Sequence, residues 1–211
     1  MVEAQNHSRS KRRCCCCCIF NKVWKFLLAT IIFVALIMLI LFLVIKPRTF
    51  KFSVNEAKLT QFNYTTKTNT LHYNLVLNFT SRNPNKNLNI YYDEINGHVS
   101  YEGTRFASSN VITRLNSFHQ YTNSTNRITG VFSGKRVVVF DRDQVSDFIR
   151  DKKNRVFRID VKLYFKLRFV LDDFYVGHSK GNIKCGLYVP FDSNGTKVIN
   201  AFQPTKCDVN F

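Results

Sequence analysis

The longest apolar stretch of the chain runs from Phe26 to Ile45 and contains no charged residue. A helix of this length rises about 30 Å, which matches the hydrocarbon thickness of a bilayer. A secretory signal would have a shorter apolar run with a small-residue cleavage site, which Ile-Leu-Phe-Leu-Val-Ile does not offer. The alternative is a buried core helix, which the length of the run and its lack of a polar face disfavour. The pattern predicts a transmembrane helix over residues 23–45, between a basic, Cys-rich tail (1–22) and a domain of residues 46–211.

After residue 50 the apolar positions alternate with polar ones, which is the period of a half-buried β-strand. The longest run, 156–171, places apolar residues on one face and charged residues on the other. Asn83-Pro84-Asn85 and Asp172-Asp173 are typical of turns. Strands are predicted at residues 50–54, 71–79, 88–92, 95–101, 106–115, 128–140, 156–171 and 174–189.

One helix is predicted among these strands. Asp141 can cap its first turn, and Gln144 stands at the reciprocal capping position. Val145, Phe148 and Ile149 follow with helical spacing. Because strands and helices do not alternate, we expect a mainly β fold: an antiparallel two-sheet sandwich of the fibronectin III or immunoglobulin-like kind, with one short helix.

The formal net charge of the chain is +17, and a basic chain is often a nucleic-acid binder. Here the charges after residue 46 are scattered through alternating strands, so we expect no Lys/Arg-rich face and no nucleic-acid partner. An anionic membrane surface or an acidic wall polysaccharide is an equally good electrostatic partner. Basic residues are more numerous before the apolar helix than just after it. This bias predicts a cytosolic N-terminus and an exported C-terminal domain.

The cysteines fall into two groups. Five consecutive ones, Cys14, Cys15, Cys16, Cys17 and Cys18, lie directly before the predicted span. Zinc sites need spacers between their ligands, whereas cysteines beside a span are substrates for S-palmitoylation. The alternative is a set of unmodified thiols.

The exported region has two further cysteines, Cys185 and Cys207, which can pair in an oxidising compartment or remain buried thiols. Four acceptor motifs for N-glycosylation also follow the predicted span. Their asparagines are Asn63, Asn78, Asn123 and Asn194. We expect lower occupancy at Asn78, because the adjacent Phe79 belongs to a core-facing set.

Several segments together resemble the plant non-race-specific disease resistance/harpin-induced-like family, whose domain is of the late embryogenesis abundant group 2 type. The segments that carry this resemblance are Arg82–Asp93 (RNPNKNLNIYYD), Phe118-His-Gln with Asn123-Ser-Thr, Cys185–Phe191 (CGLYVPF) and Thr205–Phe211 (TKCDVNF). The order of basic tail, cysteine cluster, single span and β domain is similar too. The resemblance implies a fibronectin III-like sandwich, a plasma-membrane location, and a role in pathogen-triggered (hypersensitive) and stress responses.

The resemblance implies no catalytic activity, and the residues agree. His72, His98, His119 and His178 are dispersed, and no phosphate loop or nucleophile elbow is present. We therefore expect no enzyme, no cofactor and no metal site. Three hypotheses remain: a defence-signalling component that binds a protein, a membrane–wall tether that binds acidic polysaccharide, and an apoplastic hydrolase. A strongly basic sheet face would favour the tether, and a pocket with paired carboxylates or a Ser–His contact would be needed for the hydrolase.

Overall fold

The computed structural model describes residues 10–45, 48–191 and 202–211, which belong to two compact units, Met1–Lys46 and Pro47–Phe211. The first unit contains helix α1 (Ser10–Ile45). Within α1, the stretch Phe20–Ile40 is long and apolar enough to cross a membrane, and none of it is buried. The hydroxyl of Thr30 donates to the Leu27 carbonyl at 2.8 Å, so this polar group is satisfied inside the helix. The predicted apolar helix is thus present and is a candidate membrane span.

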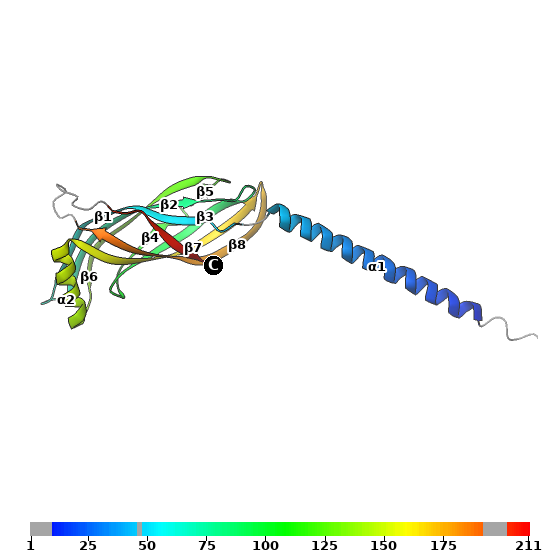
Figure 1. Ribbon diagram of the computed structural model, residues 1–211, viewed down its shortest axis with the longest axis horizontal. Helices are drawn as coiled ribbons and strands as arrows, with labels where there is room; N and C mark the ends of the chain where they lie inside the picture. Colours follow the sequence, from blue (N-terminus) through cyan, green and yellow to red (C-terminus); the bar gives the residue numbers. More distant parts are fainter. Residues whose placement is uncertain (1–9, 46–47, 192–201) are drawn as a thin grey trace, which may run out of the picture. The chain divides into compact units, whose positions relative to one another are not determined.

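The second unit is mainly β and antiparallel (Figure 1). In the part of the chain that the structure describes, its strands are β1 (Lys51–Thr65), β2 (Thr70–Arg82), β3 (Asn89–Tyr101), β4 (Thr104–Ile112), β5 (Phe118–Gln120), β6 (Thr125–Val137), β7 (Val156–Leu171), β8 (Phe174–Pro190) and β9 (Thr205–Asn210). Helix α2 (Arg142–Asn154) lies between β6 and β7 in the chain.

The strands follow one path, β4-β3-β7-β8-β9-β1-β2-β6, and β5 pairs with β3 beside it. The short strand β9 therefore connects two groups of strands, because it pairs with β8 on one side and with β1 on the other. The predicted mainly β, antiparallel fold is confirmed. A separate two-sheet sandwich of the fibronectin III or immunoglobulin-like kind stays a prediction, because the described strands form one nearly closed sheet through β9.

The core lies between the inward faces of the strands. Alternate side chains of β7, from Phe157 to Leu167, are almost completely buried. At the α2 end, the Phe62 ring centroid lies 4.8 Å from that of Phe157 and 5.4 Å from that of Phe148 on α2. The predicted capping box of α2 is present: the Asp141 side chain accepts from the Gln144 backbone, and the Gln144 side chain accepts from the Asp141 backbone.

Several predicted strand limits were wrong, and β-bulges account for two of them. The run predicted at 50–54 continues to Thr65, because register shifts at Val54/Glu56 and Leu59/Gln61 break the period of two. The runs predicted at 88–92 and 95–101 form one strand, β3, with a shift at Tyr92/Glu94. Two short strands, β5 and β9, were missed because three and six residues are too few for a period to show.

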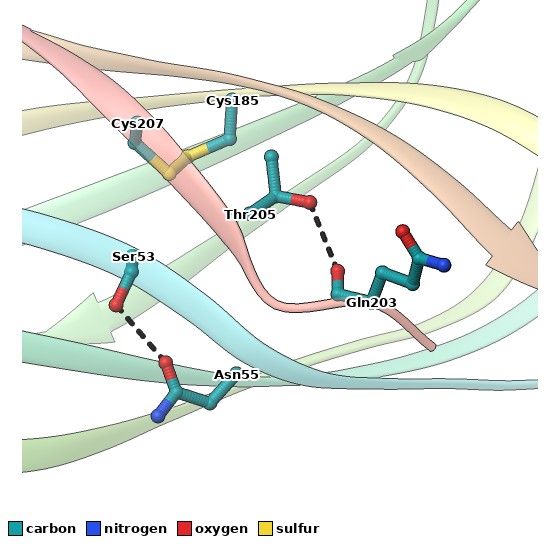
Figure 2. The surroundings of a disulfide bond; sticks show 6 residues. All are labelled: Ser53, Asn55, Cys185, Gln203, Thr205 and Cys207. Atoms are coloured by element: carbon teal, nitrogen blue, oxygen red, sulfur yellow. Dashed lines mark hydrogen bonds between the residues drawn. A yellow bond between two sulfur atoms is a disulfide. The ribbon is translucent and has the colours of Figure 1, made fainter. Parts of the chain in front are cut away.

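Cys185 of β8 and Cys207 of β9 form a disulfide, with their Cα atoms 4.6 Å apart (Figure 2). The pairing expected from the sequence is therefore the one in the structure. In the register of the sheet, Cys207 lies opposite Phe52 of β1. The disulfide thus fastens β9, the connecting strand, at the place where it joins both groups of strands.

Candidate functional site

Four lysines occupy the outward side of the central strands β7 and β8. Alternation points Lys162 and Lys166 outward from β7, and the register places Lys184 and Lys180 directly opposite them on β8. Directly opposed side chains have Cβ atoms about 5 Å apart, and like charges at that distance destabilise a sheet. The two pairs lie about 13 Å apart along the strands, four residues at about 3.3 Å each. We call this outward side of β3, β7 and β8 the lysine face.

An aromatic side chain lies between the two lysine pairs. Tyr164 is 39% exposed and lies opposite Asn182. The Lys162 ammonium lies 4.8 Å from the centre of the Tyr164 ring, within the range of a cation–π contact. The His98 ring of β3 approaches the same tyrosine, with centroids 5.2 Å apart. The centre of the face is therefore a tyrosine ring that contacts the Lys162 ammonium and the His98 ring.

Two cations, Arg105 and Lys162, lie near His98 on this part of the face. His98 lies opposite Lys162, and its Nδ1 is 3.2 Å from Nη1 of Arg105 on β4. Burial, followed by the nearby charges of Arg105 and Lys162, lowers the pKa of His98. Burial and the nearby cations both disfavour protonation of this imidazole, and the same cations would attract an anion.

Two acidic residues of β3 neutralise part of the lysine face. Glu94 binds Lys166 at 2.5 Å, and hydrogen bonds from Lys166 and Asn96 lower the pKa of Glu94. Asp93 binds Arg168 through both carboxylate oxygens, at 2.7–2.9 Å. These pairs, with Arg114 and Ser117, line an open groove of about 360 Å³. Among the described residues no ion pair involves the other three lysines of the face, although Asp208 of β9 lies opposite Lys184.

The centre of the outward side of β1, β2 and β6 carries amide side chains where the lysine face carries lysines. Asn74 donates to the Thr60 hydroxyl at 2.8 Å, and Asn78 donates to Glu56 and accepts from Thr129. The cations of this side lie at the strand ends, where Lys51 is opposite Arg82, or opposite uncharged residues, for instance Lys58 opposite Val76. We call it the amide face.

The lysine face contradicts one expectation from the sequence. No Lys/Arg-rich face was expected, because the basic residues are scattered along the chain. That prediction was wrong, since alternation collects them on one side of β7 and β8 and the register then pairs them. Their charges could be listed from the sequence, but the register that brings them together could not.

The expected modification sites fall in different places. Asn123 is exposed in the turn between β5 and β6, with φ of 49°. Asn63 is exposed on β1, and its side chain accepts from Lys152 at 3.0 Å. Asn78 is engaged in the amide face, and Asn194 lies outside the described residues. No acceptor motif falls on the described lysine face.

The other candidates from the sequence show no shared chemistry. The backbone of Cys14–Cys18 belongs to α1. Asp172 and Asp173 form the predicted turn between β7 and β8. The four histidines of the β domain lie on different strands, and the described residues contain no cluster of three or more potential metal ligands.

Comparison with known proteins agrees with the resemblance found in the motifs. The model of the late embryogenesis abundant protein family matches residues 78–185. The chain is 39% identical to NDR1/HIN1-like protein 3 of Arabidopsis thaliana, over 90% of this chain and 80% of that protein. The chain belongs to the NDR1/HIN1-like family. It is also similar to NDR1/HIN1-like protein 10 (36% identity, 89% and 82% covered) and protein 2 (37% identity, 81% and 69% covered), both of A. thaliana.

Several motif residues of this NDR1/HIN1-like chain are built into the fold, whereas Asp93, which ends the first motif, lies on the lysine face. The Gln120 amide is fully buried, donates to the Ser81 carbonyl at 2.8 Å and accepts from the Tyr92 hydroxyl at 2.9 Å. Asn83 is also buried and donates to the Leu88 carbonyl at 2.7 Å. Burial raises the pKa of Tyr92, so its phenol stays protonated. The motif residues therefore fix the joint between β2, β3 and β5.

Proposed function

We propose that this chain is a single-pass plasma-membrane protein of plant defence and stress responses, which acts by binding. The family membership supports the defence and stress role, and α1 supports membrane anchoring. An N-terminus in the cytosol and a β domain outside the cell agree with the basic residues before α1. A disulfide at Cys185–Cys207 fits an oxidising compartment.

Binding rather than catalysis is supported by the state of the carboxylates in the groove. A general acid needs a carboxyl group with a raised pKa. The pKa of Glu94 is lowered instead, and both oxygens of Asp93 accept hydrogen bonds from Arg168. Ser117 is the hydroxyl residue of this groove. Among the hydrogen bonds of the described residues, none links Ser117 to a base that could activate it as a nucleophile. The groove is therefore better suited to hold charge than to transfer protons.

The partner can be a defence-signalling protein or an acidic wall polysaccharide, and the lysine face favours the second. Opposed lysines are unfavourable in the free protein, and an anion placed between them would relieve the repulsion. Two such pairs about 13 Å apart suit a linear chain with repeated carboxylates. Tyr164, between the pairs, offers a flat ring on which a sugar can lie. The proposal rests on one observation: Lys162 lies opposite Lys184, and Lys166 lies opposite Lys180.

Equilibrium binding of the full chain, held in lipid nanodiscs, to polygalacturonate tests this proposal. We expect binding that weakens with salt, and much weaker binding to uncharged dextran. The double variant Lys162→Gln/Lys184→Gln should bind about tenfold more weakly, because each exposed ion pair contributes up to about 1 kcal/mol.

The matched control is Lys58→Gln/Lys135→Gln on the amide face. It removes the same charge from two exposed positions whose strand neighbours are Val76 and His72. We expect a loss of less than about twofold there, through the general field alone. Equal losses in the two double variants would mean that net charge, and not the lysine face, attracts the polymer.

Membrane topology and acylation need separate tests. Protease added to sealed, right-side-out plasma-membrane vesicles should digest the β domain, and full protection would reverse the proposed orientation. We also propose that Cys14–Cys18 are acylated, since they stand beside the span. Replacing all five by serine should abolish labelling by a palmitate analogue. Persistent labelling would place the acyl groups elsewhere.

A further inference from the structure

The β7–β8 hairpin exposes three large apolar side chains in succession. Phe174 is 77% exposed, Tyr175 60% and Val176 49%. Strand β9 pairs with β8 only over Asn182–Lys184, so residues 174–181 form a sheet edge in the described chain. Soluble domains protect such apolar edges or cover them with a partner. The hairpin therefore has the composition of a contact surface.

The hairpin lies at the end of the β unit where the polypeptide enters. The Arg48 backbone is bound on both sides by the Asn85 side chain: its N–H donates to Oδ1 at 2.5 Å, and its carbonyl accepts from Nδ2 at 2.8 Å. Four residues after Asn85, Asn89 begins β3 and pairs with Val170, which directly precedes the end of β7. Arg48 and the hairpin thus share one end of the unit, and α2 lies at the other (Figure 1).

Chain length ties this end to the apolar helix. Only residues 46 and 47 separate Arg48 from Ile45, the last residue of α1. Three peptide steps span at most about 11 Å. We propose that the hairpin rests on the lipid surface through Phe174, Tyr175 and Val176. The proposal depends on the membrane anchoring proposed above, which the experiment below tests separately.

The chemistry of the hairpin limits the contact to the headgroup level. Aromatic side chains with a polar group are enriched at this depth, and the Tyr175 hydroxyl shares a hydrogen bond with His178 Nδ1 at 3.0 Å. Asp172 and Asp173 form the turn itself, and charged carboxylates are costly in hydrocarbon. The hairpin is therefore expected to lie on the membrane and not to insert through it.

Quenching of tryptophan fluorescence by brominated lipids tests the contact in the full chain. Trp24 is the only tryptophan, so Trp24→Phe provides a background without tryptophan. Tyr175→Trp is added to it and the chain is reconstituted into phosphatidylcholine vesicles. Tyr188→Trp is the matched control: Tyr188 lies on the same strand and is 68% exposed, about 40 Å farther along β8.

We expect quenching of the tryptophan at position 175 to be at least about threefold stronger than at position 188. Bromine close to the headgroup should quench it more than bromine near the end of the acyl chain. Adding Phe174→Ser and Val176→Ser should reduce the quenching about twofold. The melting temperature should not change, because both side chains are exposed.

Quenching of Trp24 in the unaltered chain separates the possible failures. If Trp24 is quenched and positions 175 and 188 behave alike, the hairpin proposal is overturned and the anchoring stands. Stronger quenching by deep than by shallow bromine at position 175 also overturns the proposal, because it means insertion. If Trp24 is not quenched, the anchoring fails and the hairpin contact fails with it.

Discussion

The lysine face and the amide face are made from the same pattern of alternation, but their centres differ. On β7 and β8 the outward positions bring Lys162 against Lys184 and Lys166 against Lys180. On β1, β2 and β6 the corresponding central positions hold Asn74 and Asn78, whose side chains hydrogen-bond to Thr60, Glu56 and Thr129. One face keeps unbalanced charge at its centre, and the other satisfies its polar groups internally.

The difference teaches that arrangement, more than net charge, marks a candidate binding surface. The amide face also carries cations, including Lys51, Lys58 and Lys135. Its side-chain amides already have partners, so a ligand would have to replace existing hydrogen bonds. The lysine face places Lys162 against Lys184, a repulsive arrangement in which neither ammonium group has an ion-pair partner among the described residues. The two faces therefore predict different responses to the same kind of substitution.

The largest expected effect comes from breaking the strand that joins the two faces. Cys207→Ser removes the disulfide that fastens β9, and a bridge closing a loop of this size contributes about 3 kcal/mol. For a domain of this size the melting temperature of the full chain should fall by roughly 10 °C. Calorimetry or circular dichroism on the nanodisc-held chain measures the fall. An unchanged melting temperature would mean that the disulfide is not needed to hold β9.

A gain of binding is expected when the neutralised part of the lysine face is released. Asp93→Asn removes the carboxylate that pairs with Arg168, so affinity for polygalacturonate should rise about twofold. The matched control is Glu56→Gln, which removes one negative charge from the amide face and leaves an acceptor for Asn78. Binding measured at equal salt should distinguish the two variants. A rise in both, or in the control alone, would argue against a special role for the lysine face.

A smaller effect is expected from pH through His98. The pKa of His98 is lowered in the folded protein, so the unfolded chain binds more protons and stability falls as pH drops below the ordinary histidine value of about 6.5. A bound polyanion would favour the charged imidazole, so affinity should rise by up to about twofold between pH 7 and pH 5.5. Titration of wild type beside His98→Asn measures both slopes. Equal pH slopes in the two proteins would place His98 outside the binding surface.

The smallest effect on binding is expected from the glycans. Asn63→Gln, Asn78→Gln and Asn123→Gln should each leave polygalacturonate binding unchanged, since these residues lie on β1, on β2 and in the turn before β6. In plant-expressed protein the gel mobility should shift most with Asn123, which is exposed in a turn, and least with Asn78. A changed affinity on loss of a glycan would show that the amide-face side of the domain also contacts the polymer.

Local features of the fold could be predicted from the sequence because neighbours in the chain determine them. The capping box of α2 needs only Asp141 and Gln144, three residues apart, and the structure contains it. The turn at Asp172-Asp173 and the apolar helix are equally local. The disulfide could be expected because residues 46–211 contain only two cysteines.

Features that depend on pairing between distant segments could not be predicted in this way. The bulges in β1 and β3 change the phase of alternation. In the sequence, β3 therefore appeared as two separate runs, and only the first part of β1 was recognised as a strand. The lysine pairs depend on the register of β7 against β8, which a bulge at Phe169/Val170 shifts by one residue from the register that the two-residue turn alone would set. The buried contact between Gln120 and Tyr92 joins residues 28 positions apart, although both belong to motifs that signalled their importance.

The most direct test of the central claim is a lysine footprint of the full chain in nanodiscs, with and without polygalacturonate. Acetylation at each lysine is quantified by mass spectrometry after brief exposure to the reagent. The account predicts that the polymer slows acetylation of Lys162, Lys180 and Lys184, while Lys58 and Lys135 react as before. Equal protection on both faces, or protection of Lys58 and Lys135 alone, would contradict it.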